Sequence, residues 1–163
     1  MRFRKQQAAQ SPPADVYQGL RQQVLDLTSE QLGDSFAEEP LLALVMETRY
    51  PEAVATLVAV VDGTTSLYFS NGGGVVGAGS HAAVAEASER WLEAGRAVLA
   101  QLSEVTEPRL PADGVTQLLA VTPAGMRGLA VPEAELGEGR HDLAPLFYAG
   151  QDVITQIRLA EAG

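Results

Sequence analysis

A glycine-rich segment near the middle of this 163-residue chain has the residue spacing most suggestive of chemistry. Gly72, Gly74 and Gly77 match the pattern G-x-G-x-x-G, between an apolar run and an amphipathic run. In dinucleotide-binding proteins such glycines let the backbone approach a pyrophosphate at the start of a helix. The candidate ligand-binding residues of this chain are therefore Gly72, Gly73, Gly74, Gly77, Gly79, Ser80 and His81.

Three observations argue against a dinucleotide site. The fingerprint belongs to the first β-α-β unit of a parallel sheet, whereas the strand expected before Gly72 closes an antiparallel meander. Residues 120–122 (Ala-Val-Thr) end the following strand and include no acidic residue to hold the ribose. The only lysine is Lys5, so the glycine segment lacks the lysine that a Walker-type phosphate loop requires. Two interpretations stay open: an anion bound at the helix start beside Ser80 and His81, or glycines that form a bulge or a close crossing.

Histidine and serine do not form a catalytic set. His81 and His141 are the only two histidines, and no H-x-x-H or H-E-x-x-H spacing for zinc occurs. Ser80 lacks the second glycine of a G-x-S-x-G nucleophile turn and is expected to cap a helix. Zero cysteines exclude thiolate catalysis and iron–sulfur clusters. We therefore expect no catalytic residues, no metal ligands and no cofactor, and an enzymatic function is the less favoured interpretation.

Composition restricts the class of partner. The chain has 11 basic and 21 acidic residues, a formal net charge of −10. Nucleic acid binding needs clustered lysine and arginine, so no nucleic acid partner is expected, and an acidic surface favours basic partners. No apolar run approaches the roughly 18 residues of a transmembrane helix, so no membrane association is expected. The lack of cysteine and of a signal-peptide pattern indicates a cytoplasmic location.

Hydrophobic periodicity predicts a flexible arm over residues 1–13 and a single α+β domain over residues 14–163. Three helices are expected to start near Asp15, Ser80 and Asp142. The five expected strands are residues 41–48, 53–61, 66–69, 115–121 and 126–131. The order is α-βββ-α-ββ-α. Hairpin connections predict a five-stranded, mainly antiparallel sheet with the helices packed on one face.

This element order, together with the size and acidity of the chain, resembles that of the type III secretion chaperones. Across residues 15–161 the resemblance implies a homodimer that holds a partner polypeptide in extended form. The order is also similar to the profilin-like roadblock and longin scaffolds, which place two strands before the middle helix and three after it. The leading hypothesis is a non-enzymatic, chaperone-like protein-interaction module that binds a protein or peptide. The alternative is a small-ligand or anion-binding protein that uses the glycine segment at 72–79 and the following helix start.

Overall fold

The computed structural model describes residues 13–162. The predicted arm over residues 1–13 lies outside this range except for Pro13, which belongs to the first described helix. The described elements, in chain order, are α2 (Pro13–Leu25), α3 (Ser29–Leu32), η1 (Asp34–Phe36), β1 (Ala43–Arg49), β2 (Val54–Val60), β3 (Thr65–Phe69), β4 (Gly74–Val75), η2 (Ala78–Ser80), α4 (Ala82–Val98), η3 (Leu99–Gln101), β5 (Ser103–Val105), β6 (Val115–Thr122), β7 (Gly125–Pro132), α5 (Glu133–Gly137) and α6 (Ala144–Ala162).

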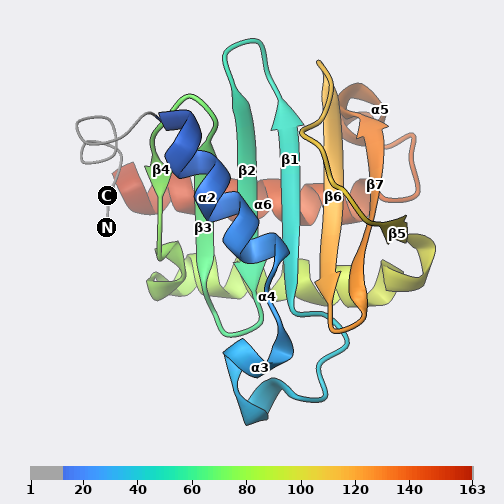
Figure 1. Cartoon of the computed structure of the whole chain (residues 1–163). Coiled ribbons are helices and arrows are strands. Elements are labelled where there is room, and N and C mark those ends of the chain that lie inside the picture. The colour runs from blue at the N-terminus through green and yellow to red at the C-terminus, as the bar shows by residue number, and fades with distance from the viewer. Residues whose placement is uncertain (1–12, 163) are drawn as a thin grey trace.

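The strands form one antiparallel sheet in the order β4-β3-β2-β1-β6-β7-β5 (Figure 1). The predicted α+β class and antiparallel pairing are confirmed, but the prediction of five strands was wrong, because the sheet has seven. The two additional strands, β4 and β5, lie at the two edges and contain only two and three residues. Strands this short carry no hydrophobic period, so the sequence pattern does not reveal them.

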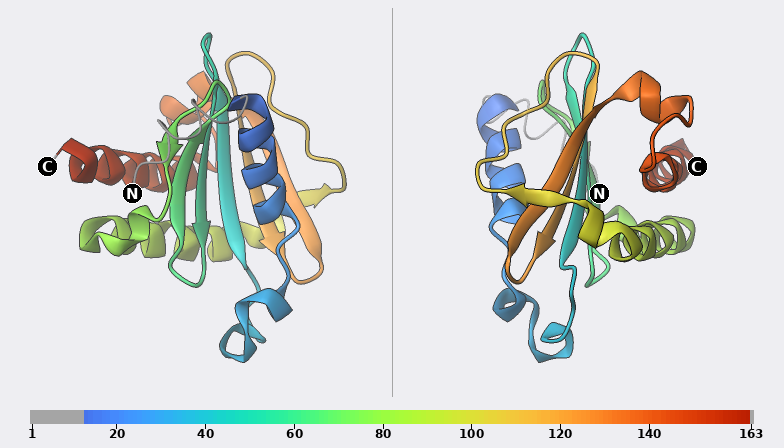
Figure 2. Two further views of the ribbon diagram at one scale, coloured as in Figure 1. Left: turned by 60° about the vertical axis from the view of Figure 1, so that its left-hand side comes forward. Right: turned by 90° about the vertical axis from the view of Figure 1, so that its right-hand side faces the viewer.

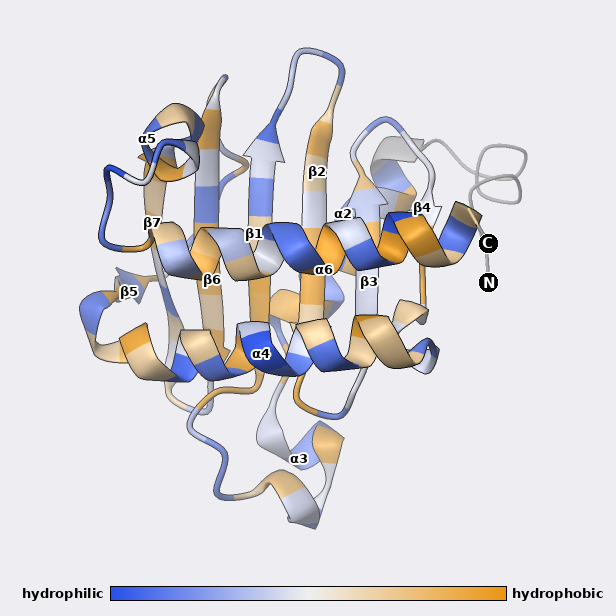
Figure 3. Ribbon diagram, turned by 180° about the vertical axis from the view of Figure 1, so that it is seen from behind, coloured by the Kyte–Doolittle hydropathy of each residue, from blue (hydrophilic) through white to orange (hydrophobic). Residues whose placement is uncertain are grey.

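Helices cover both faces of the sheet, and the prediction of helices on one face was wrong. Figure 2 shows α2 against one face and α4 and α6 against the other. Seen from behind, α4 and α6 cross the strands side by side (Figure 3). The physical reason is the amphipathic stripe of α2: Tyr17 and Leu25 are buried against Val45 and Val58 of the central strands. The domain therefore has three layers.

Two hydrophobic cores follow from the alternation of side chains along each strand. Leu44 and Met46 of β1 point to the side of α4 and α6, where Trp91 is fully buried. Ala43 and Val45 of the same strand point to the side of α2. Six of the seven residues of β1 are buried, as expected for a strand covered on both faces.

None of the helices within residues 13–162 is long and apolar enough to cross a membrane.

Candidate functional site

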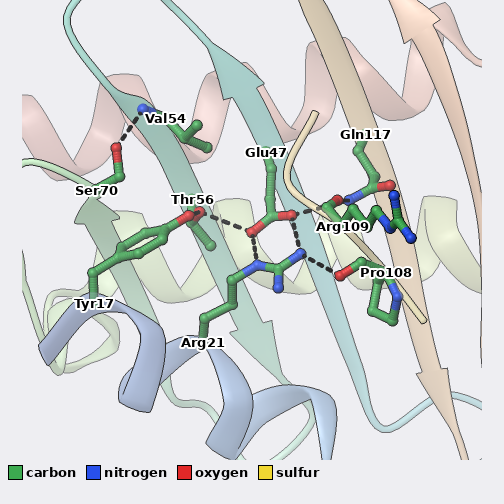
Figure 4. Close-up of polar contacts among 9 residues, drawn as sticks. All are labelled: Tyr17, Arg21, Glu47, Val54, Thr56, Ser70, Pro108, Arg109 and Gln117. Atoms are coloured by element: carbon green, nitrogen blue, oxygen red, sulfur yellow. Dashed lines mark hydrogen bonds and ion pairs between the residues drawn. The ribbon is translucent and has the colours of Figure 1, made fainter. Parts of the chain in front are cut away.

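A buried carboxylate lies at the centre of the sheet, on the face covered by α2. The side chain of Glu47 in β1 has an exposed fraction of 0%. Arg21 of α2 donates to both of its oxygens, from Nε to Oε2 at 2.6 Å and from Nη2 to Oε1 at 2.9 Å. Thr56 Oγ1 donates at 3.0 Å and Gln117 Nε2 at 3.1 Å (Figure 4). The carboxylate is thus both charge-paired and hydrogen-bonded, as a buried ion requires.

The strand register brings these side chains together. Thr56 of β2 and Gln117 of β6 both lie directly opposite Glu47 across the antiparallel ladders. Residues paired in this way project their side chains to the same face of the sheet. The three residues therefore form a polar row across β2, β1 and β6, beside the apolar residues that α2 covers.

Helix α2 supplies the other half of the cluster. Tyr17 and Arg21 are four positions apart and share one side of the helix. The Tyr17 hydroxyl lies 2.5 Å from Thr56 Oγ1, and Arg21 Nη2 also donates to the carbonyl oxygen of Pro108 at 3.3 Å. Burial lowers the pKa of Arg21, but the hydrogen bonds and the charge of Glu47 outweigh it and hold this pKa above its ordinary value. The guanidinium therefore remains charged, and with α2 in place the carboxylate is closed to any substrate.

Alkaline pH is expected to weaken the fold through Tyr17. Burial, assisted by the negative charge of Glu47, raises the pKa of Tyr17 to about 12 from its ordinary 10.0. Between about pH 10 and 12 the unfolded chain therefore loses a proton that the folded chain keeps, so the free energy of unfolding falls as pH rises. Two pKa units correspond to about 2–3 kcal/mol. Urea unfolding at a series of pH values should show a shallower loss for Tyr17→Phe than for the wild type, and equal slopes would contradict this account.

A groove on the opposite face adjoins the C-terminal half of α6. One cavity of about 370 Å³ lies between α6 and the strands β2 and β3. It is lined by Tyr50, Glu52, Ala53, Ala55, Leu67, Phe69, Asn71, Gln151, Ile154 and Arg158. A second cavity of about 300 Å³ is lined by Phe69, Asn71, Gly72, Gly73, Gly74, Val75 and Glu161. Because both cavities share Phe69 and Asn71, we treat them together as one α6 groove, which extends from Tyr50 to Val75.

Charged groups of both signs surround the Tyr50 end of the α6 groove. Burial raises the pKa of the Tyr50 hydroxyl, the negative charge of Glu133 raises it further, and the positive charge of Arg158 opposes this shift. Arg158 is exposed and forms no ion pair with any other residue of the described range. An exposed cation therefore belongs to the lining of this cavity and is available to a bound molecule.

The predicted glycine site is divided between two places. Gly72, Gly73 and Gly74 line the α6 groove, whereas Gly77, Gly79, Ser80 and His81 lie beyond β4, where Gly79 contacts Gly63 of the β2–β3 turn. Several backbone N–H groups of the segment already have internal acceptors: that of Gly72 donates to Phe69 O and that of Gly77 to Ser66 Oγ. The N–H groups of Ser80 and His81 also donate within the segment, to Gly77 O and Ala78 O.

Two of the glycines have a structural role. A Cβ on Gly74 would overlap the carbonyl oxygen of Leu67, and a Cβ on Gly79 would overlap that of Gly63. Glycine therefore permits β4 to pair with β3 and the segment to pass close to the β2–β3 turn. The prediction that Ser80 caps the following helix was wrong, because Ser80 ends η2 and His81 occupies the N-cap position of α4.

The two histidines, His81 and His141, lie at different helix starts and make different contacts. The Nδ1 atom of His141 accepts the backbone N–H of Leu143 at 3.0 Å, which satisfies a donor at the start of α6. His81 makes no side-chain hydrogen bond to α4. Within residues 13–162, no three or more His, Cys, Asp and Glu side chains are grouped so that they could hold a metal ion.

No protein-family model, curated protein or solved structure matches this chain. Sequence reasoning had identified neither Glu47 nor the α6 groove. The sequence signal for the buried cluster is a single acidic residue directly after the apolar run of residues 41–46. The groove joins residues from β2, β3, β4 and α6, and nothing in the one-dimensional pattern groups them.

Proposed function

We propose that this chain is a non-enzymatic interaction module that binds an extended peptide segment in the α6 groove. The observation that carries the proposal is the placement of the two cavities: they share Phe69 and Asn71 in their linings and follow one another along the C-terminal half of α6. A compact ligand would need only one of them. An extended chain, whose successive side chains are spaced along its length, would fill both.

The chemistry of the groove suits a peptide. Its deepest side chains are apolar, with Leu67 and Ile154 almost completely buried and Phe69 partly accessible. Its rim includes Tyr50, with an exposed fraction of 42%, and Arg158. Tyrosine and arginine next to an apolar pocket are the residue types that contribute most to binding energy at protein interfaces. The preferred segment would place an apolar side chain in the pocket and an acidic group near Arg158.

We also propose that the protein has a chaperone-like activity, forms a homodimer and is located in the cytoplasm, as expected from the sequence. The competing hypothesis is that the glycine segment binds a small ligand or an anion, since Gly72, Gly73 and Gly74 line the same groove. A small anion bound there would compete with the peptide.

Peptide selection on the full-length protein tests the proposal. A random decapeptide library is selected on the immobilised wild type, and the affinities of the recovered peptides are measured by fluorescence polarisation. Ala55 lies on the floor of the groove and is partly accessible, so Ala55→Leu should fill the pocket. We expect this substitution to weaken binding by about tenfold or more, equivalent to about 1.4 kcal/mol.

Charge reversal at the rim supplies the second variant and its control. Arg158→Glu should also weaken the selected peptides by about tenfold, since it places a negative charge where an acidic group binds. Arg140→Glu, an exposed arginine that pairs with Glu138 outside the groove, should leave affinity unchanged. Selected peptides that bind Ala55→Leu and Arg158→Glu as tightly as the wild type would overturn the proposal. A library that yields no binder, while phosphate compounds raise the melting temperature, would favour the small-ligand alternative.

A further inference from the structure

Helix α2 contacts the sheet as a bound ligand would, with two of its side chains held in a polar site. Among the residues that the structure describes, Tyr17 and Arg21 supply the side-chain hydrogen bonds between α2 and parts of the chain distant in sequence. The Arg21 guanidinium fits between the Glu47 carboxylate and the Pro108 carbonyl oxygen, in the bidentate geometry that arginine makes with carboxylates (Figure 4). Glu47 of the sheet and Pro108 of the connection between β5 and β6 thus form a guanidinium site, and this chain fills it with its own arginine.

Helix α2 has a low intrinsic tendency to form a helix. Gly19 lies in its middle, exposed and with no neighbouring atom within 4 Å of the position of a Cβ, so packing does not require a glycine there. Glycine is among the weakest helix formers, so α2 owes its helical state to the contact with the sheet. Its C-terminal end leads into the connection over residues 26–42, which contains only short helical turns.

The polar row of Glu47, Thr56 and Gln117 lowers the free-energy cost of exposing the sheet face beneath α2. If α2 moved away, Glu47 would meet water rather than remain an unpaired buried charge, and Thr56 and Gln117 would be hydrated with it. A buried ion that loses its partner without gaining water is strongly destabilising. The polar row therefore makes an opened sheet face far less unfavourable than an entirely apolar face would be.

We propose that the sheet face beneath α2 is a second docking surface, which fits a partner's amphipathic helix carrying an aromatic residue and an arginine four positions apart. Helix α2, with Tyr17 and Arg21, occupies this surface within the chain and is exchanged for the partner helix. Apolar positions of the partner would contact Val45, Val58 and the other apolar residues that α2 now covers. A basic partner is favoured by the Glu47 carboxylate and by the net charge of −10.

Hydrogen exchange on the full-length wild type gives the first test. If α2 is exchangeable, its amides exchange through a local opening, with protection about tenfold or more below that of β1 and β6. Equal protection in α2 and in these central strands would overturn the proposal, because α2 would then leave only when the whole domain unfolds.

A peptide supplied in trans gives the second test. The probe is a labelled peptide of residues 13–28, and the acceptor is full-length Gln22→Pro, which breaks the internal helix at an exposed position. We expect about tenfold tighter binding to Gln22→Pro than to the wild type or to Gln22→Ala. A peptide carrying Arg21→Glu should bind about tenfold more weakly than the native peptide. Equal binding of the two peptides would contradict the guanidinium site, and complete unfolding of Gln22→Pro would contradict an exchangeable α2.

Discussion

Arg21→Ala should lower the free energy of unfolding by about 3–5 kcal/mol, the largest effect we expect from a single substitution. Arg21 supplies two of the four hydrogen bonds to Glu47 and is its cationic partner. Its removal leaves a carboxylate with an exposed fraction of 0% in the centre of the sheet. Urea denaturation at neutral pH, followed by circular dichroism, measures this loss directly.

A double substitution separates the cost of an unpaired charge from the value of the pair itself. Replacing a buried ion pair with apolar residues of similar volume is often neutral or stabilising. We therefore expect Arg21→Leu combined with Glu47→Leu to recover most of the stability that Arg21→Ala loses. If the double variant is as unstable as Arg21→Ala, the cluster stabilises the fold in its own right and the account of an isolated buried charge is wrong.

The proposed exchange of α2 adds a limit to this effect. Once Arg21→Ala has raised the free energy of the closed state above that of the open state, α2 detaches and Glu47 becomes hydrated. The loss of stability then stops at the opening free energy of α2, and helical signal falls while the sheet remains folded. A loss at the upper end of the range, with cooperative unfolding of all elements, would argue against an easily opened α2.

Gly79→Ala should be the second severe substitution, at about 3 kcal/mol. The new Cβ would overlap the Gly63 carbonyl oxygen, and Thr65 Oγ1 lies 3.4 Å from the same position. A backbone oxygen cannot rotate away as a side chain can, so the glycine segment or the β2–β3 turn must shift. Thermal unfolding should show a fall on the order of 10 °C for a chain of this size.

Gly137→Ala is the matched control for this prediction. Gly137 lies in α5 with open space around the position of its Cβ, and an alanine there should stabilise by about 0.4–1 kcal/mol through the unfolded state. If Gly79→Ala were as stable as Gly137→Ala, the close approach of the two backbones would not be needed for folding. The glycine at position 79 would then require another explanation, such as a ligand.

Much of the secondary structure could be predicted from local pattern. The runs that became β1, β2, β3, β6 and β7 are apolar or β-branched, and hairpin turns between them predicted antiparallel pairing. The same runs also contained the information that the prediction of a half-covered sheet overlooked. A strand covered on one face alternates, whereas residues 41–46 and 57–61 are continuously apolar, which is typical of strands buried on both faces.

The sites were harder to predict because they depend on register and on distant neighbours. Glu47 is one carboxylate that follows an apolar run, and its role is visible only once the fold places Thr56, Gln117 and Arg21 around it. The spacing of the glycines predicted one binding site, but β4 divides the segment between the groove and the β2–β3 turn. At two of its positions glycine is needed because two backbones pass closely: Gly74 lies against Leu67, and Gly79 lies against Gly63.

The most direct test of the proposed function is to locate a selected peptide on the protein. Backbone and methyl NMR spectra of the full-length chain are recorded during titration with the tightest peptide from the library. We expect the largest shift changes around Ala55, Leu67, Phe69 and Ile154, with none beyond the noise at the exposed turn near Ala124. Shift changes confined to other surfaces, with the groove resonances unmoved, would contradict the proposal that the α6 groove binds an extended peptide.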